Sequence, residues 1–232
     1  MSCLAIITAR GGSKRIPRKN IREFLGRPII EYSIDAALKS GCFDEVMVST
    51  DDEEIAEIAK KAGASVPFLR SDANANDFAT TSDVMKEVIS EYEKRGQQFD
   101  YVCCIYPTAP FITAERLKEA IEKLASTGAY SVVPVIRFSF PPQRGLVIKD
   151  DVLSYIHPEY TFTRSQDLEP VYHDAGQFYC VNTKAFMEKC SLFGDTTKEL
   201  ILDEMEVQDI DTITDWKLAE LKYRLLHEET NS

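Results

Sequence analysis

Short apolar runs alternate with amphipathic segments along residues 1–136, and this alternation limits the fold more than any other feature. The apolar runs have the length of buried strands: residues 3–8, 45–50, 101–106 and 131–136. The segments between them carry apolar residues at helical spacing: 28–40, 51–63, 81–95 and 113–126. Strands joined through helices need right-handed crossovers, so the pattern predicts an α/β fold with a mostly parallel sheet covered on both faces.

The pattern changes after Ile136. Residues 137–175 are rich in proline, aromatic and charged residues, and a hairpin turn is expected at 149–151. We interpret this stretch as an inserted arm or lid within a single domain that spans residues 1–232. The remaining expected elements are short strands at 66–69, 176–181 and 206–210 and a closing helix at 214–227.

Charge and composition argue against several classes of protein. The chain carries 27 Lys and Arg against 38 Asp and Glu, whereas proteins that bind nucleic acid or anionic membranes present a basic surface. The six cysteines have no metal-binding spacing, and we expect them to be reduced thiols. The sequence shows no signal peptide and no apolar stretch long enough to span a bilayer. It therefore predicts a cytoplasmic protein without a nucleic-acid or membrane partner.

One basic segment stands out in this acidic chain: ARGGSKRIPRKN, at residues 9–20, directly after the first expected strand. Its glycines, Gly11 and Gly12, allow a sharp turn in which free backbone N–H groups form a concave anion site. The side chains that can add charge-assisted hydrogen bonds to phosphate are Arg10, Lys14 and Lys19. The loop after the first strand lies at the ligand-binding edge of an open α/β sheet, so we interpret it as a phosphate site. An exposed turn with solvated charges is the alternative.

Two aspartates in VQDIDTITD, at residues 207–215, form a second candidate site. On the expected strand, Asp209 and Asp211 point to the same face because side chains alternate. Paired carboxylates of this kind suit Mg²⁺ that is shared with a substrate phosphate. In a chain with 38 acidic residues, the same spacing is also compatible with an ordinary acidic surface.

Two further segments combine polar and aromatic residues. YPTAPF, at residues 106–111, follows a buried strand, and RSQDLEPVYHDAGQFY occupies residues 164–179. Each is also compatible with a structural loop, and a lone His such as His173 is more often structural than catalytic. The sequence contains neither a G-x-S-x-G motif nor an H-E-x-x-H zinc motif.

Taken together, these segments resemble the CMP-sugar-acid synthetases, the cytidylyltransferases that activate nine-carbon sialic acids. The resemblance covers nearly the whole chain through five ordered motifs: ARGGSKRIPRKNI, VSTDDEEIAEIAKKAGA, LRSDANANDFATTSDV, YPTAPF and the late DID. It implies a Rossmann-like, doubly wound domain of the nucleotidyltransferase type. It also implies a homodimer, with residues 137–175 as the arm that reaches the partner.

Tyr106 and the run from His173 to Gly176 refine the resemblance. Synthetases for sialate typically have Gln before the Pro-Thr pair and an Arg-Pro-Asn-Gly-like run late in the chain. The residues found here look more like those of members that act on pseudaminic acid. The resemblance therefore favours pseudaminic acid as the acceptor, with N-acetylneuraminate, legionaminate and a Kdo-like acid as alternatives.

The resemblance implies a role for each matching residue. The residues expected to bind the nucleotide are Ala9, Arg10, Gly11, Gly12, Ser13, Lys14, Lys19, Asn20, Arg70 and Thr81. The residues expected to line the sugar site are Tyr106, Thr108, Arg164, His173 and Gln177. Asp209 and Asp211 would bind Mg²⁺, the implied cofactor, and the catalytic groups would be Arg10, Lys19 and Asp211. We expect Arg15 and Arg18 to be solvated.

The implied reaction is the in-line attack of the anomeric hydroxyl of a 2-keto sugar acid on the α-phosphorus of CTP, with release of pyrophosphate. A nucleotide-binding module without turnover is the alternative from another class of protein. Such a module has little need for paired aspartates beside a phosphate loop. A purely structural protein would leave both charged segments unexplained.

Overall fold

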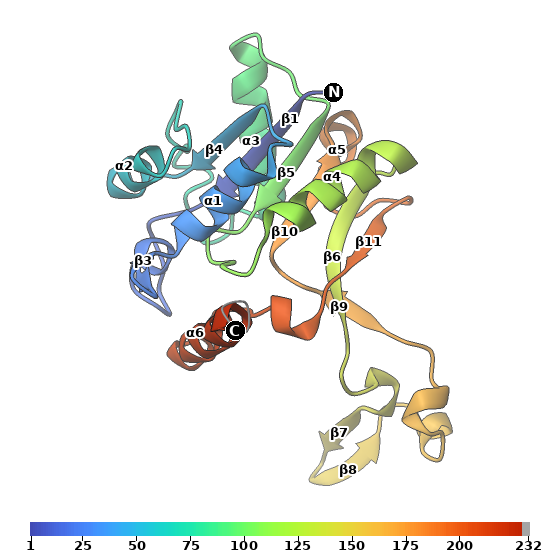
Figure 1. The fold of residues 1–232 in the computed structure, drawn as a ribbon. Coiled ribbons are helices and arrows are strands. Elements are labelled where there is room, and N and C mark those ends of the chain that lie inside the picture. The colour runs from blue at the N-terminus through green and yellow to red at the C-terminus, as the bar shows by residue number, and fades with distance from the viewer. Residues whose placement is uncertain (229–232) are drawn as a thin grey trace.

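A 7-stranded sheet forms the centre of the protein in this computed structural model, which describes residues 1–228 (Figure 1). The strands follow the order β11-β6-β10-β5-β1-β4, and β9 pairs with β6 beside this path. Their bounds are β1 Cys3–Thr8, β4 Glu45–Ser49, β5 Tyr101–Ile105, β6 Ser131–Arg137, β9 Tyr172–Asp174, β10 Phe178–Asn182 and β11 Lys198–Ile201.

The strand directions confirm the mostly parallel sheet. β1 is parallel to β4 and β5, and β11 is parallel to β6. β10 is antiparallel to both β5 and β6, so β5 and β6 themselves point the same way. The carboxyl ends of β4, β1, β5, β6 and β11 therefore meet at one edge, where ligands bind in open α/β sheets.

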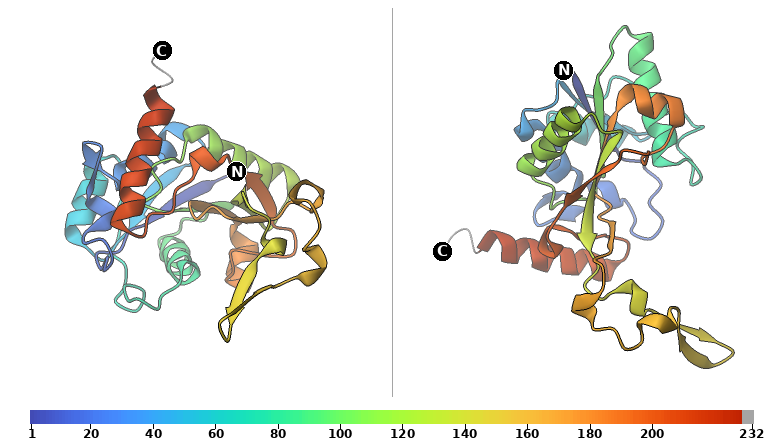
Figure 2. Two further views of the ribbon diagram at one scale, coloured as in Figure 1. Left: turned by 90° about the horizontal axis from the view of Figure 1, so that it is seen from below. Right: turned by 90° about the vertical axis from the view of Figure 1, so that its right-hand side faces the viewer.

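Helices cover both faces of the sheet, as the right-hand view of Figure 2 shows. One face is covered by α1 Ile30–Ser40, α2 Glu53–Lys61 and α4 Ala114–Thr127, and the other by α3 Thr81–Lys94 and α5 Thr183–Lys189. Alternate residues of β1 enter the two resulting cores: Ala5 and Ile7 face α1, and Leu4 and Ile6 face α3. This is why a doubly covered strand reads as a continuous apolar run.

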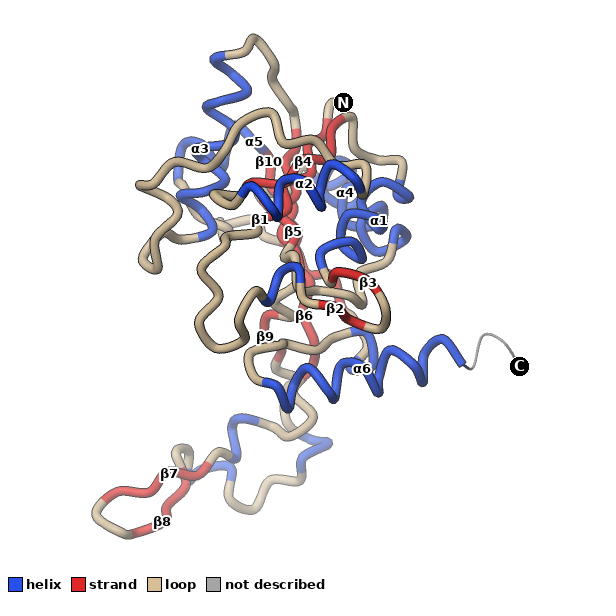
Figure 3. Tube along the Cα trace, turned by 90° about the vertical axis from the view of Figure 1, so that its left-hand side faces the viewer, coloured by secondary structure: helices blue, strands red, loops and turns tan. Residues whose placement is uncertain are grey.

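A third apolar cluster joins the two ends of the chain. The final helix, α6 Ile213–Glu228, packs Trp216 and Ala219 against Ile16 and Phe24 from the basic loop and the short hairpin that follows it. That hairpin pairs β2 Glu23–Phe24 with β3 Arg27–Pro28 and lies beside α6 (Figure 3). The Phe24 ring makes edge contacts with Tyr32, Trp216 and Tyr223. The cluster fixes residues 207–212 against the loop after β1.

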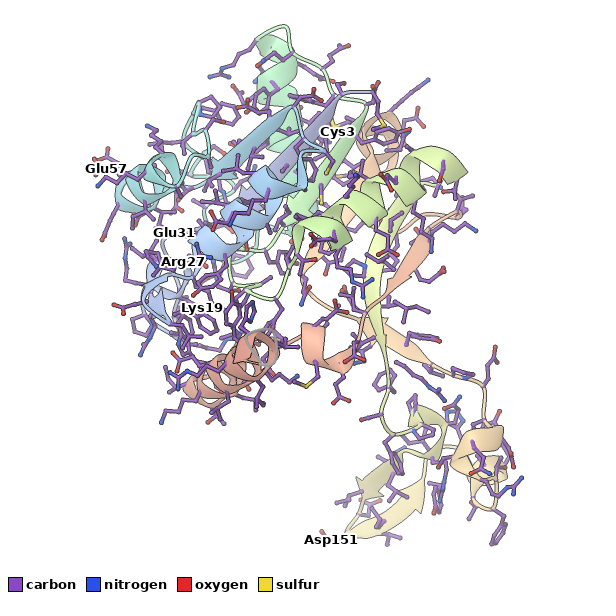
Figure 4. All side chains as sticks on the ribbon, viewed as in Figure 1. Cys3, Lys19, Arg27, Glu31, Glu57 and Asp151 are labelled. Carbon is purple, nitrogen blue, oxygen red and sulfur yellow. The ribbon has the colours of Figure 1, made fainter. Side chains whose placement is uncertain are left out.

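The chain leaves the body of the protein between β6 and β9 and forms an arm (Figure 1). The arm contains β7 Leu146–Lys149, β8 Val152–Tyr155 and the 3₁₀ turns Pro142–Arg144, Pro158–Tyr160 and Ser165–Asp167. The turn predicted at 149–151 is confirmed: Asp150 and Asp151 have φ angles of 51° and 59°. Figure 4 shows Asp151 at the tip of this hairpin.

Two of the predicted strands are wrong. Residues 66–69 make no strand: only Ser65 bridges to Met47, and Pro67 cannot donate a ladder hydrogen bond. Of residues 206–210, Glu206 ends the 3₁₀ turn Glu204–Glu206 and the others follow it as a loop. The carbonyls of Val207 and Ile210 accept hydrogen bonds from lysine side chains instead of from a neighbouring strand.

Two expectations from composition concerned the cysteines and membrane-spanning stretches. All six cysteines are free, and Cys3, Cys103, Cys104 and Cys180 are buried. No helix in the described part of the chain combines the length and apolar character that a membrane crossing requires.

Replacing Phe24 with alanine should separate α6 from the basic loop. Phe24 is fully buried, so Phe24→Ala is expected to cost about 3–5 kcal/mol of unfolding free energy. The measurement is chemical denaturation, with the emission maximum of Trp216, the one tryptophan of the chain, as a local probe. Phe78→Ala is the control, because Phe78 is 92% exposed and its loss should cost less than about 0.5 kcal/mol. Equal stability of the two variants would contradict this packing.

Candidate active site

A cavity of about 260 Å³ opens at the carboxyl edge of the sheet. The loops after β1 and β5 and the start of α3 form its walls. Its lining includes nine of the predicted site residues: Arg10, Ser13, Lys14, Lys19, Asn20, Arg70, Thr81, Tyr106 and Thr108. A larger cavity, of about 710 Å³, lies at the opposite edge around Met1, Asp100 and Thr183, but none of the predicted residues lines it. The predicted site residues therefore gather at the smaller cavity.

Three predicted nucleotide residues, Ala9, Gly11 and Gly12, lie outside the lining of the cavity, and Asn20 also supports the loop from within. Ala9 is buried in the core, and its N–H donates to the carbonyl of Ser49 over 2.9 Å. Gly11 and Gly12 do not line the cavity. The side-chain amide of Asn20 is buried and donates to the carbonyl of Arg10 over 2.8 Å, which fixes the base of the loop.

The glycine turn differs from the predicted row of free N–H groups. Gly11 donates its N–H to Asp51 Oδ1 over 2.9 Å, and Ser13 donates to the carbonyl of Gly11 over 3.0 Å. A Cβ at Gly11 would lie 2.7 Å from Asp52 Oδ2. Glycine is therefore needed here for a close approach to α2, and the amides of Gly11 and Ser13 are already engaged within the chain.

Acidic side chains from three distant segments pair with the basic loop. Arg10 Nη1 lies 2.6 Å from Asp77 Oδ1, and Lys14 also pairs with Asp77. Arg15 Nη1 lies 2.6 Å from Asp211 Oδ2. Arg15 is 70% exposed, so its side chain is solvated as expected, and it also forms this ion pair. Asp77 was not among the predicted site residues, although it belongs to the LRSDANANDFATTSDV motif.

Arg18 is only 40% exposed and links the loop to the start of α2, so the expectation of a simply solvated side chain is wrong for this residue. It donates to Asp52 and Glu54 at the start of α2 and adopts a left-handed backbone with φ of 54°. Asp52 also accepts the N–H of Ile55 as the N-cap of α2. The hydrogen bond from Arg18 lowers the pKa of Asp52 below its usual range.

Lys19, which is labelled in Figure 4, joins the basic loop to the late DID motif. Its ammonium donates to the carbonyl of Ile210 over 2.7 Å and lies 3.7 Å from Asp211 Oδ1. Burial lowers the pKa of Lys19, and the carboxylates of Asp211 and Asp209 oppose this shift. The two motifs, 191 residues apart, therefore meet at one point of the site.

The paired aspartates sit on a loop, which corrects the strand on which their common orientation was predicted. Buried Ile210 separates them and belongs to the cluster beneath α6. Both carboxylates act on Lys19, so they share its electrostatic surroundings. No group of three or more His, Cys, Asp or Glu side chains suited to a metal occurs among residues 1–228. Two hard carboxylates that need further oxygen ligands fit Mg²⁺ held jointly with substrate phosphates.

A second cavity, of about 380 Å³, adjoins the first through Tyr106, which lines both. His173, Asp174, Asp209 and Lys222 are among its lining residues. The Tyr106 hydroxyl lies 3.2 Å from Thr81 Oγ1, and burial raises its pKa. A third cavity, of about 450 Å³, continues toward the arm and shares Ile136 and Glu204 with the second.

Two predicted sugar-site residues lie outside these cavities. The side chain of Arg164 lies on the arm, 71% exposed and paired with Asp167 at 2.7 Å. Gln177 is buried, and its amide donates to the carbonyl of Glu206 over 2.7 Å. The structure thus brings Tyr106 and His173 together in the second cavity and leaves Arg164 and Gln177 apart from it.

Comparison with known proteins identifies the family. The family model described as cytidylyltransferase matches residues 4–189, most of the chain. The chain belongs to the cytidylyltransferase family. This cytidylyltransferase is 43% identical to the pseudaminic acid cytidylyltransferase of Campylobacter jejuni, over 98% of this chain and 99% of that one. It is 40% identical to the CMP-N,N'-diacetyllegionaminic acid synthase of Legionella pneumophila, over 95% of each chain.

Solved structures show the same fold for the cytidylyltransferase. A CMP:2-keto-3-deoxy-manno-octonic acid synthetase complexed with CTP superposes with a TM-score of 0.70 at 16% identity, over 98% of this chain and 100% of that one. The 4-diphosphocytidyl-2C-methyl-D-erythritol synthase of Anaerococcus prevotii gives a TM-score of 0.68 at 17% identity, over 96% of each chain. At these identities the likeness shows the fold alone.

The ion pair between Arg18 and Asp52 predicts that the stability of the protein depends on pH. The pKa of Asp52 is lower in the folded state than in the unfolded state, where it is about 3.9. The contribution of Asp52 to folding stability is therefore present above the unfolded pKa and is lost as the pH falls through the folded pKa. Arg18→Met should therefore destabilise the protein by about 1 kcal/mol at pH 7 and by less at pH 2 to 3. Denaturation of both proteins across this range provides the measurement. Arg224→Met, which removes an exposed cation, is the control. If Arg18→Met lowered the unfolding free energy equally at all pH values, the stabilising role of the Arg18–Asp52 ion pair would be contradicted.

Proposed function

We propose that this cytidylyltransferase transfers CMP from CTP to the anomeric hydroxyl of pseudaminic acid and releases pyrophosphate. The observation that carries the proposal is the pair of adjoining cavities that share Tyr106. The first is lined by basic side chains of the loop after β1, which suits a triphosphate, and the second offers aromatic and polar groups, which suit a sugar acid. The relative with 43% identity, a pseudaminic acid cytidylyltransferase, supports the choice of acceptor.

In the proposed complex, the triphosphate takes over the cations of the basic loop. Arg10 and Lys14 would turn from Asp77 to phosphate oxygens. Lys19 would keep its contact with the carbonyl of Ile210 and also donate to phosphate. Ser13 can add a hydroxyl donor, and the buried Arg70 and Asn20 line the inner part of the cavity, where the nucleoside would bind. Charge-assisted hydrogen bonds to phosphate are stronger than neutral ones, which favours this exchange.

The reaction exchanges one P–O bond for another and releases the proton of the attacking hydroxyl. The anomeric oxygen attacks the α-phosphorus, the bond from that phosphorus to the β-bridging oxygen breaks, and the hydroxyl proton passes to solvent. Arg10 and Lys19 would stabilise the charge that develops on the leaving pyrophosphate. Tyr106, at the junction of the cavities, would orient the acceptor toward the nucleotide.

Asp209 and Asp211 would hold Mg²⁺ together with phosphate oxygens. When bound, the metal would neutralise phosphate charge and lower the pKa of the attacking hydroxyl. To act as a metal ligand, Asp211 must first release Arg15, with which it forms an ion pair. Arg15 is 70% exposed, so it can turn away at little cost.

The arm supports a homodimer, which we include in the proposal. Its hairpin carries large apolar side chains that are more than half exposed: Leu146, Ile148, Val152 and Leu153. A gathering of such residues on a projecting hairpin marks an interaction surface. A cytoplasmic location is part of the same proposal, because the donor substrate CTP is a cytoplasmic nucleotide.

Incubation with CTP, Mg²⁺ and a panel of sugar acids tests the function. Pyrophosphate release is expected with pseudaminic acid, and the panel includes legionaminate, N-acetylneuraminate and a Kdo-like acid as the alternative acceptors. No release with any acid would leave a nucleotide-binding module without turnover. Release with another acid alone would overturn the choice of acceptor.

A test variant and a matched control use the same assay. Asp211→Asn should lower kcat at least about 100-fold, because a charge that the reaction needs is removed. Asp195→Asn changes an aspartate that is 92% exposed and pairs with Lys189, so it should leave kcat unchanged. Similar activity in both would remove Asp211 from the proposed machinery.

Disruption of the arm should change the assembly. Ile148 and Leu153 face each other across the hairpin, and the double variant Ile148→Asp/Leu153→Asp is expected to shift the protein from dimer to the 26.2 kDa monomer. Sedimentation equilibrium measures the mass. Leu221→Asp, on an exposed position of α6, is the control for a general effect of added charge. A monomeric wild type would overturn the proposed dimer.

A further inference from the structure

The second cavity contains one cationic side chain among several acids. Asp174, Glu204 and Asp209 line it, and Lys222 of α6 is the one Lys or Arg of its lining in the described chain. We propose that Lys222 binds the carboxylate of the sugar acid. This inference rests on the function proposed above and names the residue that recognises the acid group of the acceptor.

The ammonium of Lys222 is held in place by neutral acceptors. It donates to the carbonyl of Glu204 over 3.0 Å and to the carbonyl of Val207 over 2.9 Å. An ammonium has three N–H donors, so one remains for a ligand. The side chain is oriented before the substrate arrives, which reduces the entropy lost on binding.

The charge of Lys222 is not neutralised by a carboxylate. Within residues 1–227, no Asp or Glu lies within ion-pair distance of its ammonium. The cations of the nucleotide loop differ in this respect, because Arg10, Lys14 and Arg15 each pair with an aspartate. An oriented cation with its charge uncompensated, in the wall of a cavity, is suited to an anionic group of a ligand.

The geometry of the proposed reaction puts the carboxylate in this cavity. In a 2-keto sugar acid, the carboxyl carbon is bonded directly to the anomeric carbon whose hydroxyl attacks the nucleotide. The acid group must therefore lie close to the junction of the two cavities, at Tyr106. There it meets Asp174 and Asp209, and like charges repel unless a cation compensates them. Lys222, in the lining of the same cavity, supplies that cation.

Arg137 is the rival for this role. It ends β6 and lines the third cavity, toward the arm, but not the cavity that contains Tyr106. A group bound there would be separated from the reacting phosphorus by the second cavity. Arg137 is therefore placed to meet the far end of the sugar acid.

Steady-state kinetics with pseudaminic acid and with its C1 carboxamide provide the test. Wild type should prefer the acid in kcat/KM by about 10- to 100-fold, the value of one charged hydrogen bond. Lys222→Gln keeps an amide donor for the two carbonyls but removes the charge, so it should use both compounds with similar efficiency. Its KM for CTP should stay unchanged, and Lys222→Arg should restore part of the preference.

Other variants separate this role from a structural one. Lys217→Met, on the exposed side of α6, should keep the preference of the wild type. A Lys222→Gln protein that keeps the preference, or an Arg137→Met protein that loses it instead, would overturn the assignment. A fall in kcat/KM for both compounds by the same factor would mean that Lys222 only supports residues 204–207, and would also overturn it. If the wild type releases no pyrophosphate with any sugar acid, the proposed function fails rather than the assignment of Lys222.

Discussion

The contact between Lys19 and the carbonyl of Ile210 is the point on which the arrangement of the site depends. It links the loop after the first strand to the segment before the last helix, and the cluster around Phe24 and Trp216 holds that link in place. Hydrophobic packing supplies the stability, since one hydrogen bond contributes only about 1 kcal/mol. Without this docking, the basic loop and the paired aspartates would be unrelated features of the chain.

The acidic character of the protein has a local consequence at the site. The basic loop is paired internally with Asp77, Asp211 and the residues at the start of α2. In the proposed reaction, nucleotide binding exchanges some of these ion pairs for phosphate contacts. Exposed ion pairs such as that of Arg15 with Asp211 cost little to break. The ion pair of Arg18 with Asp52 instead stabilises the fold by holding the loop to the start of α2. The five basic side chains of residues 9–20 therefore differ in role: some can exchange their partners for phosphate, and Arg18 is structural.

The strengths and errors of the sequence predictions have physical causes. Strands buried on both faces, such as β1 and β5, reveal themselves as continuous apolar runs. β11 at the sheet edge was missed because only Leu200 of its four residues is buried, and α5 was missed because it spans seven residues. The strand expected at 206–210 failed because the alternation of Asp209, Ile210 and Asp211 has the period of a strand but no neighbour with which to pair.

The sequence by itself determined the strands β1, β4, β5 and β6, the helices α1 to α4, the arm and the identity of most residues around the first cavity, because apolar periodicity and contiguous motifs are local properties. Only the tertiary structure decided which charges pair, that Gln177 faces the interior, and that Lys222 reaches the second cavity. These depend on contacts between residues far apart in the chain, such as Arg15 with Asp211. A side chain's partner is set by how distant segments pack, and no spacing within one segment encodes that.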